Sequence, residues 1–97
     1  MALPWVFPSS ASAASALHVA VNKGNVEEVK RLLSKGVNVN SLSLSGYTPL
    51  HISAGWDRRH VTGLLVIHGA KINVRSVSGW TPLHLAAHKN KEKIVQL

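Results

Sequence analysis

Apolar residues recur at spacings of three and four in two segments of the chain: Val29, Leu32 and Leu33, then Val61, Leu64, Leu65 and Ile67. This spacing places the apolar side chains of each segment on one face of a helix. A glycine follows each segment, Gly36 in one case and Gly69 in the other, which is typical of a helix C-terminus. The pattern therefore predicts two amphipathic helices, with Leu32 and Leu65 in the core.

Two other segments begin with threonine followed by proline. Thr48 and Thr81 are suited to cap a helix, because a threonine hydroxyl can accept from a free backbone N–H, and proline is favoured at the first helical position. The residues that follow are mostly small or aliphatic: Leu50, Ile52, Ser53 and Ala54, then Leu83, Leu85, Ala86 and Ala87. These segments are predicted to be short helices that neighbouring helices can approach closely.

The segments between the helices have the composition of turns. Residues 37–46 and 70–79 combine Asn, Ser and Gly with alternating apolar residues, which favours an extended turn or a hairpin-like connector. Gly24, Asp57 and Asn90 follow one another at intervals of 33 residues. All three residue types tolerate the left-handed conformation of a tight turn. We therefore expect a turn between two helices at each of these positions.

One motif repeats along the chain. Gly46-Tyr-Thr-Pro-Leu-His51 matches Gly79-Trp-Thr-Pro-Leu-His84 at an offset of 33 residues, and Ser15-Ala-Leu-His18 keeps part of the motif one period earlier. Each period holds two helices and a loop, which cannot bury their apolar faces alone. Stacked units form a continuous core, and about three units are needed for stability.

These motifs resemble the ankyrin repeat. The resemblance covers residues 12–97 and implies an all-α fold, an ankyrin-repeat solenoid of stacked helix-turn-helix units with projecting β-turn or hairpin loops. We expect units at about 13–45, 46–78 and 79–97, the last incomplete, and a flexible N-terminal arm over residues 1–11. The incomplete unit favours a piece of a longer array, and the alternative is that this end meets another surface.

In ankyrin proteins, partners usually dock on the loops and on the adjoining face of the first helices. Carried over by phase, these positions are Leu44, Ser45, Tyr47, Gly55, Trp56, Val77, Ser78, Trp80, His88 and Lys89, with Asn22 and Lys23 in the first unit. Every aromatic residue of the repeats lies in this set, and Tyr and Trp are enriched at interface hot spots. The alternative is that the rings cover neighbouring loops and helix ends.

Basic residues also share a phase, and the chain has a formal net charge of +7. Lys23 and Lys89 are equivalent to Trp56, and Arg58 is equivalent to Lys91. A basic corner along the helix turns is therefore expected, which would favour acidic partners, nucleic acid or anionic membranes. An ordinary solvated face accounts for the same pattern.

Several chemistries are disfavoured. The chain has no cysteine, which excludes disulfides, thiolate zinc sites and thiol nucleophiles. His84 and His88 lie one helical turn apart, but a metalloprotease helix would need Glu in place of Leu85. The resemblance implies that His51 and His84 are structural. We expect no metal site, no cofactor, no catalytic residues and no transmembrane segment.

The sequence predicts a protein–protein interaction module of the adaptor or scaffold type, located inside the cell. Its expected partner-binding residues are Leu44, Tyr47, Trp56, Arg58, Val77, Trp80, His88, Lys89 and Lys91. Two alternatives stay open, a basic surface that binds nucleic acid or anionic membrane, and a targeting fragment of a larger enzyme.

Overall fold

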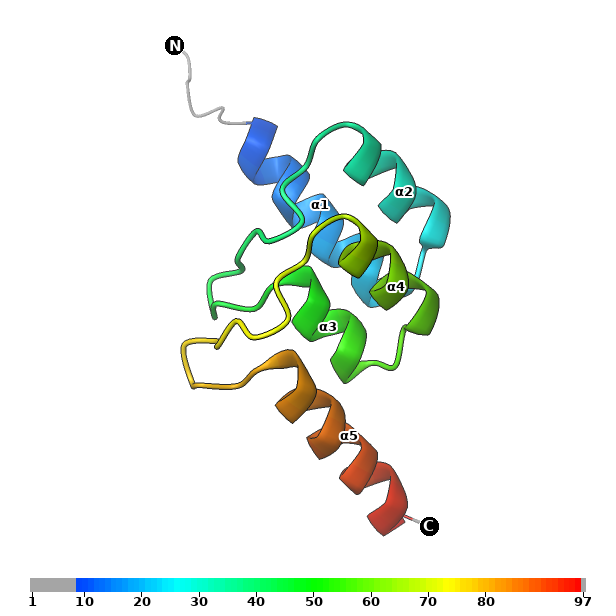
Figure 1. Ribbon diagram of the computed structural model, residues 1–97, viewed down its shortest axis with the longest axis vertical. Helices are drawn as coiled ribbons and strands as arrows, with labels where there is room; N and C mark the ends of the chain where they lie inside the picture. The colour runs from blue at the N-terminus through cyan, green and yellow to red at the C-terminus, as the bar shows by residue number, and fades with distance from the viewer. Residues whose placement is uncertain (1–8, 97) are drawn as a thin grey trace.

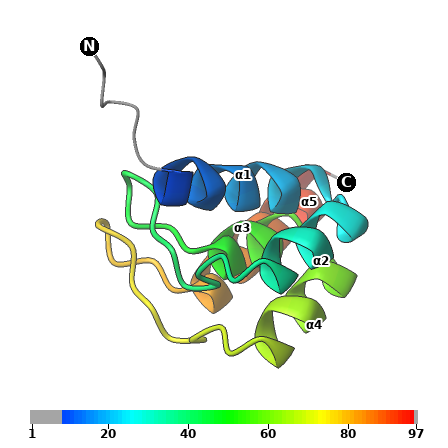
Figure 2. The same cartoon turned by 90° about the horizontal axis from the view of Figure 1, so that it is seen from above.

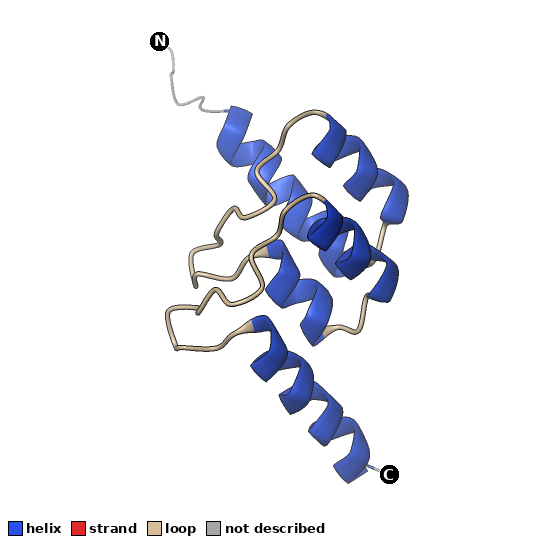
Figure 3. Ribbon diagram, viewed as in Figure 1, coloured by secondary structure: helices blue, strands red, loops and turns tan. Residues whose placement is uncertain are grey.

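The protein is a stack of helical pairs. The computed structural model describes residues 9–96, and it describes side-chain surroundings for residues 16–90. The helices of this part are α1 (Ser9–Lys23), α2 (Val26–Ser34), α3 (Pro49–Gly55), α4 (Arg59–Ile67) and α5 (Pro82–Gln96). No strand occurs among the described residues (Figure 3).

The helices form two layers. Helix α3 packs between α1 and α5, and α2 and α4 pack on α1 and α3 respectively (Figure 1). The long loops before α3 and before α5 project together from one side of the stack, which Figure 2 shows from a second direction. The predicted all-α solenoid of stacked helical pairs is confirmed.

Local sequence signals explain where the helices begin and end. Thr48 caps α3: its hydroxyl accepts from the backbone N–H of His51, and the His51 ring accepts from the backbone N–H of Thr48. The predicted turn positions Gly24 and Asp57 have φ values of 70° and 57°, which join α1 to α2 and α3 to α4. These tight turns make each helical pair antiparallel.

The core lies between the two layers and runs through the first two units. Its buried apolar residues are Leu17, Ala20, Val21, Val29, Leu32, Leu33, Val39, Leu50, Val61 and Leu65. Leu32 and Leu65 are 5% and 0% exposed, as the helical spacing predicts. Both of these units contribute to the core, so the stack itself excludes water from these side chains.

Two expectations about the ends of the domain need correction. Helix α1 begins at Ser9, inside the arm predicted for residues 1–11, and residues 1–8 of that arm lie outside the described part. The turn expected at Asn90 is absent, because α5 runs unbroken through this position. Asn90 tolerates helical as well as left-handed backbone, and residues 91–96 continue the helix beyond it.

None of the helices in the described residues is long and apolar enough to cross a membrane.

Replacing Leu65 or Leu32 with Asp should unfold the domain. Either change puts an unpaired carboxylate into the stack, and we expect a loss above about 4 kcal/mol, comparable to the whole stability of a small domain. Far-UV circular dichroism during heating measures it. Ile67→Asp is the matched control, because Ile67 lies on the same helix but is 80% exposed. Equal melting of Leu65→Asp and wild type would contradict the packing.

Candidate functional site

The two projecting loops are built alike and bonded to each other. Ser43 donates its backbone N–H to the Tyr47 carbonyl at 2.9 Å, and Ser76 does the same to the Trp80 carbonyl at 2.8 Å. Each serine hydroxyl also accepts from the backbone N–H of that aromatic residue, at 3.1 Å in both loops. These bonds close a hairpin-like turn. The loops are joined because Val77 donates its N–H to the Ser45 carbonyl at 3.0 Å.

In the first two units, a histidine of the first helix, α1 or α3, reaches across to the next loop. His51 is fully buried, and its Nε2 donates to the Trp80 carbonyl at 2.7 Å, while its Nδ1 accepts from the Thr48 N–H at 3.0 Å. His18 makes the equivalent Nε2 contact with the Tyr47 carbonyl at 2.9 Å. The structural role predicted for His51 is confirmed. Both bonds place an aromatic residue at the start of the following unit.

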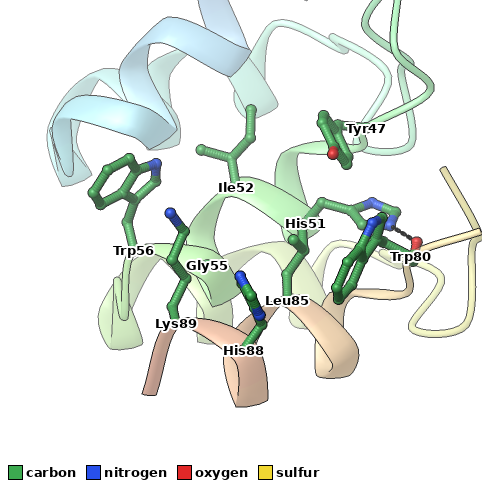
Figure 4. Close-up of a pocket in the computed structure, with 9 residues that line it drawn as sticks. All are labelled: Tyr47, His51, Ile52, Gly55, Trp56, Trp80, Leu85, His88 and Lys89. Atoms are coloured by element: carbon green, nitrogen blue, oxygen red, sulfur yellow. Dashed lines mark hydrogen bonds between the residues drawn. The ribbon is translucent and has the colours of Figure 1, made fainter. Parts of the chain in front are cut away.

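A groove lies between α3 and α5, on the side where the loops project. Its cavity volume is about 400 Å³, and Figure 4 shows the residues around it: Tyr47, His51, Ile52, Gly55, Trp56, Trp80, Leu85, His88 and Lys89. Helix α3 supplies one wall, α5 supplies the other, and the two loop ends supply Tyr47 and Trp80. Two consecutive units must therefore be stacked for the groove to exist.

Aromatic and cationic side chains of the groove lie against one another. The Lys89 ammonium is 5.1 Å from the centre of the Trp56 ring, a distance at which a cation and an aromatic face attract. The rings of Trp80 and His88 have centroids 5.4 Å apart, and those of Tyr47 and His51 are separated by the same distance. Trp56 remains 54% exposed, so much of its surface faces solvent.

Three acidic residues form ion pairs with nearby bases. The pairs are Glu27 with Lys30 at 3.8 Å, Glu28 with Arg31 at 2.6 Å, and Asp57 with Arg59 at 3.3 Å. The hydrogen bond from Arg31 lowers the pKa of the Glu28 carboxyl below its usual value. None of the nine residues around the groove is acidic, and Lys89 is the one Lys or Arg among them.

Five of the predicted site residues meet in this groove: Tyr47, Trp56, Trp80, His88 and Lys89. Leu44 and Val77 lie apart from it on the loops and are 104% and 79% exposed. They lie on the loops before α3 and before α5, which project together from the stack (Figure 1).

Arg58 faces a different part of the molecule. Its guanidinium donates from Nη2 to the Asn22 carbonyl at 2.8 Å and packs beside Gly24, so it links the turns of the first two units. Arg58 also borders a second depression with Asp57, Arg59 and Thr62, separate from the groove. Of the predicted basic corner, Lys89 borders the groove and Arg58 does not, and the side chain of Lys91 lies outside the described residues.

Three residues of the groove were not predicted as binding positions: His51, Ile52 and Leu85. Gly55 was expected on the binding face, and His51 was expected to be structural. Ile52 and Leu85 occupy the same phase of the repeat and lie one helical turn from Trp56 and His88. That shared phase is the signal that could have found them.

Replacing His51 with Ala should destabilise the stack. The change leaves the Trp80 carbonyl and the Thr48 N–H without their partners and opens a cavity, which together cost about 3–5 kcal/mol. Urea unfolding measures the free energy. His60→Ala is the control, because His60 is exposed, and its effect should stay within about 0.5 kcal/mol. Similar losses in both variants would refute the role of the imidazole.

The loop contact is tested with two glycines that share a backbone conformation. Gly46 and Gly79 have φ values of 79° and 86°, but a Cβ at Gly46 would lie 2.9 Å from the Val77 backbone nitrogen, whereas nothing lies within 4 Å at Gly79. Gly79→Ala should cost about 1 kcal/mol from the conformation alone. Gly46→Ala should cost about 1–3 kcal/mol more from the clash. Equal unfolding free energies would argue against the loop contact.

Comparison with known proteins identifies the repeats. A family model described as ankyrin repeats, three copies, matches residues 7–76, and a second model for the ankyrin repeat matches residues 78–97. Protein phosphatase 1 regulatory subunit 12A of Mus musculus is 45% identical over 47 residues, which cover 48% of this chain and 5% of that protein. The Rattus norvegicus subunit gives the same values.

A putative ankyrin repeat protein of fowlpox virus is 51% identical over 35 residues, covering 36% of this chain and 25% of the viral protein. The matched segments are thus a small part of these relatives. The family models cover both the helical pairs and the loops that form the groove. The chain belongs to the ankyrin-repeat family.

Proposed function

We propose that this chain is a protein–protein interaction module of the adaptor type, and that its partner docks in the groove between α3 and α5. The observation that carries the proposal is the gathering of Tyr47, Trp56 and Trp80 from two units around one open groove. Aromatic side chains give large contact area with few rotatable bonds, and they recur at the centres of interfaces.

The loops extend the proposed surface beyond a small-molecule pocket. Leu44 and Val77 are exposed on adjoining loops, and isolated aliphatic side chains at such positions can contact a partner that already occupies the groove. A protein or a peptide is large enough to touch both regions. We therefore assign Leu44 and Val77 to the rim and the tryptophans to the centre of the interface.

The proposal includes the absence of catalysis by this chain. Glu27, Glu28 and Asp57 are paired with bases on the surface, and both ring nitrogens of His51 already bond to the backbone. A paired acid and base aimed at a bound substrate is what general acid–base chemistry requires. Similarity to a protein named as a phosphatase regulatory subunit also supports a binding role within a larger assembly.

A second candidate function is binding of nucleic acid, which the formal charge of +7 favours. Lysine and aromatic side chains together also suit single-stranded nucleic acid, whose bases stack on aromatic rings. Such binding would weaken steeply as salt is added. We place it second because Arg58 is bonded between the helical turns and does not border the groove.

The double variant Trp56→Ala with Trp80→Ala tests the proposed interface. Loss of two central aromatic anchors should weaken partner binding by at least about thirtyfold, which corresponds to about 2 kcal/mol. Tagged wild-type and variant chains are incubated with lysate of cells that express the protein, and retained proteins are quantified by mass spectrometry. Far-UV circular dichroism checks that the helices persist.

The matched control is Val66→Ala with Ile67→Ala, which also removes two exposed apolar side chains, at 47% and 80% exposure, from outside the groove. This control should retain the same proteins as wild type. A double tryptophan variant that retains them equally well would remove the groove from the interface.

A further inference from the structure

The last unit exposes apolar positions that the earlier units bury. Leu17, Leu50 and Leu83 follow one another at intervals of 33 residues, and their exposed fractions are 0%, 4% and 75%. Val39 and Ile72 are equivalent in the same way, and they are 9% and 58% exposed. Leu83 is on α5 and Ile72 is on the loop before it (Figure 1). These two side chains therefore repeat, in uncovered form, the apolar surface on which the earlier units stack.

A histidine of the last unit repeats a bond between units without its acceptor. Nε2 of His51 donates to the Trp80 carbonyl of the next unit. His84 follows one period later, and its Nδ1 accepts from the Thr81 N–H at 3.3 Å, as Nδ1 of His51 does at Thr48. This bond leaves the proton of the neutral ring on Nε2. Among the described residues no acceptor pairs with Nε2 of His84, so it is an oriented donor at the exposed end of the stack.

An asparagine of the last unit is exposed in the same way. Nδ2 of Asn40 donates to the Gly69 carbonyl at 3.3 Å, and Oδ1 of Asn40 accepts from the Lys71 N–H at 2.8 Å, so this amide joins the first two units. Asn73 is exposed one period later, and its amide makes no such bond within the described part of the chain. We call Ile72, Asn73, Leu83 and His84 the end face.

The contacts between the first two units indicate what fits the end face. There, α4 packs on α2 and α3, and the loop that follows α4 supplies the backbone groups that bond to His51 and Asn40. An occupant of the end face must likewise offer a helix with an apolar side, followed by a loop with an unpaired carbonyl. The described loops of a second copy do not offer this carbonyl, because Tyr47 and Trp80 already accept from His18 and His51.

We infer that the end face binds an ankyrin-type unit of a partner protein, in which an amphipathic helix precedes a hairpin loop. The helix covers Leu83 and Ile72, and the backbone of the loop accepts from Nε2 of His84 and pairs with the amide of Asn73. The contact continues the interface between the first two units. It is a second interaction surface, which goes beyond the proposed function of the groove.

A labelled peptide of residues 58–90 of this sequence tests the inference. It holds the helix and the loop that pack on the equivalent positions of the earlier units, and its Trp80 carbonyl is unpaired because the peptide lacks His51. Fluorescence anisotropy at physiological salt should show saturable binding to the wild-type chain. The same peptide with Val61→Asn and Leu65→Asn should not bind, because these side chains are the buried side of α4.

Leu83→Ser should weaken binding of the peptide by at least about tenfold, because it removes the largest apolar side chain of the end face. Leu44→Ser is the matched control: it makes the same change at a leucine that is 104% exposed on the loop before α3, and it should leave the affinity unchanged. Thermal melting followed by circular dichroism checks that both variants stay folded.

His84→Asn should weaken binding by about fivefold, the effect of one lost hydrogen bond. Asparagine keeps a side-chain acceptor for the Thr81 N–H and removes the Nε2 donor. His60→Asn is the control, because His60 is exposed on α4 and Glu27, its equivalent in the covered first unit, is exposed as well. This control should bind the peptide as wild type does.

The other outcomes overturn the inference in distinct ways. Absence of saturable binding, or equal losses in the end-face variants and their controls, removes the end face as a binding site. Sedimentation equilibrium that shows self-association of wild type, abolished by Leu83→Ser, would make the occupant a second copy. Weaker peptide binding in Trp56→Ala would place the peptide in the groove. Since the groove variants and the end-face variants change different residues, either proposal can fail while the other stands.

Discussion

The bond from the buried His51 ring to the Trp80 carbonyl joins one unit to the next, and the groove depends on it. A fully buried polar ring is stable only when its nitrogens are satisfied, and here one nitrogen caps the beginning of α3 while the other holds the following loop. The same contact recurs from His18 to the Tyr47 carbonyl. Capping of a helix and stacking of units are thus coupled through single side chains, and an aromatic residue is placed at the start of each new unit.

The position of the aromatic rings follows from this coupling. Tyr47 and Trp80 are held through their backbones, so their side chains are left to face the groove and the adjoining rings. Trp56 comes from the opposite end of α3, where the helix ends and the turn to α4 begins. The scaffold therefore uses backbone groups for its own stability and leaves several large side chains for recognition, which is how one fold can serve many partners.

Charged residues of the described part have different structural surroundings. Glu28 lies beside Arg31, whose hydrogen bond keeps the pKa of that carboxyl low. Arg58, which the repeat phase grouped with the binding residues, instead bonds to the Asn22 carbonyl and joins two turns. Two residues of the predicted basic corner thus have different roles: Arg58 bridges units, and Lys89 lies over Trp56 in the groove.

The sequence alone determined the repeat period, the helical pairs of the first two units, the caps at Thr48 and the turns at Gly24 and Asp57. These features depend on residues close to one another in the chain, such as a hydroxyl before a helix or a residue that tolerates positive φ. They can therefore be predicted from the sequence. The period also put Tyr47 and Trp80 at equivalent positions of two units, and the resemblance to ankyrin repeats grouped them with Trp56 as candidate binding positions.

Only the tertiary structure decided which of these residues meet. The groove needs Ile52 from one unit and Leu85 from the next, and the long side chain of Arg58 could reach either a partner or the neighbouring turn. The continuous helix α5 was likewise not predicted, because Asn90 tolerates both a turn and a helix, and packing against other elements selects between them. Long side chains and residues of weak preference take their conformations from what surrounds them, and those surroundings form only when the units stack.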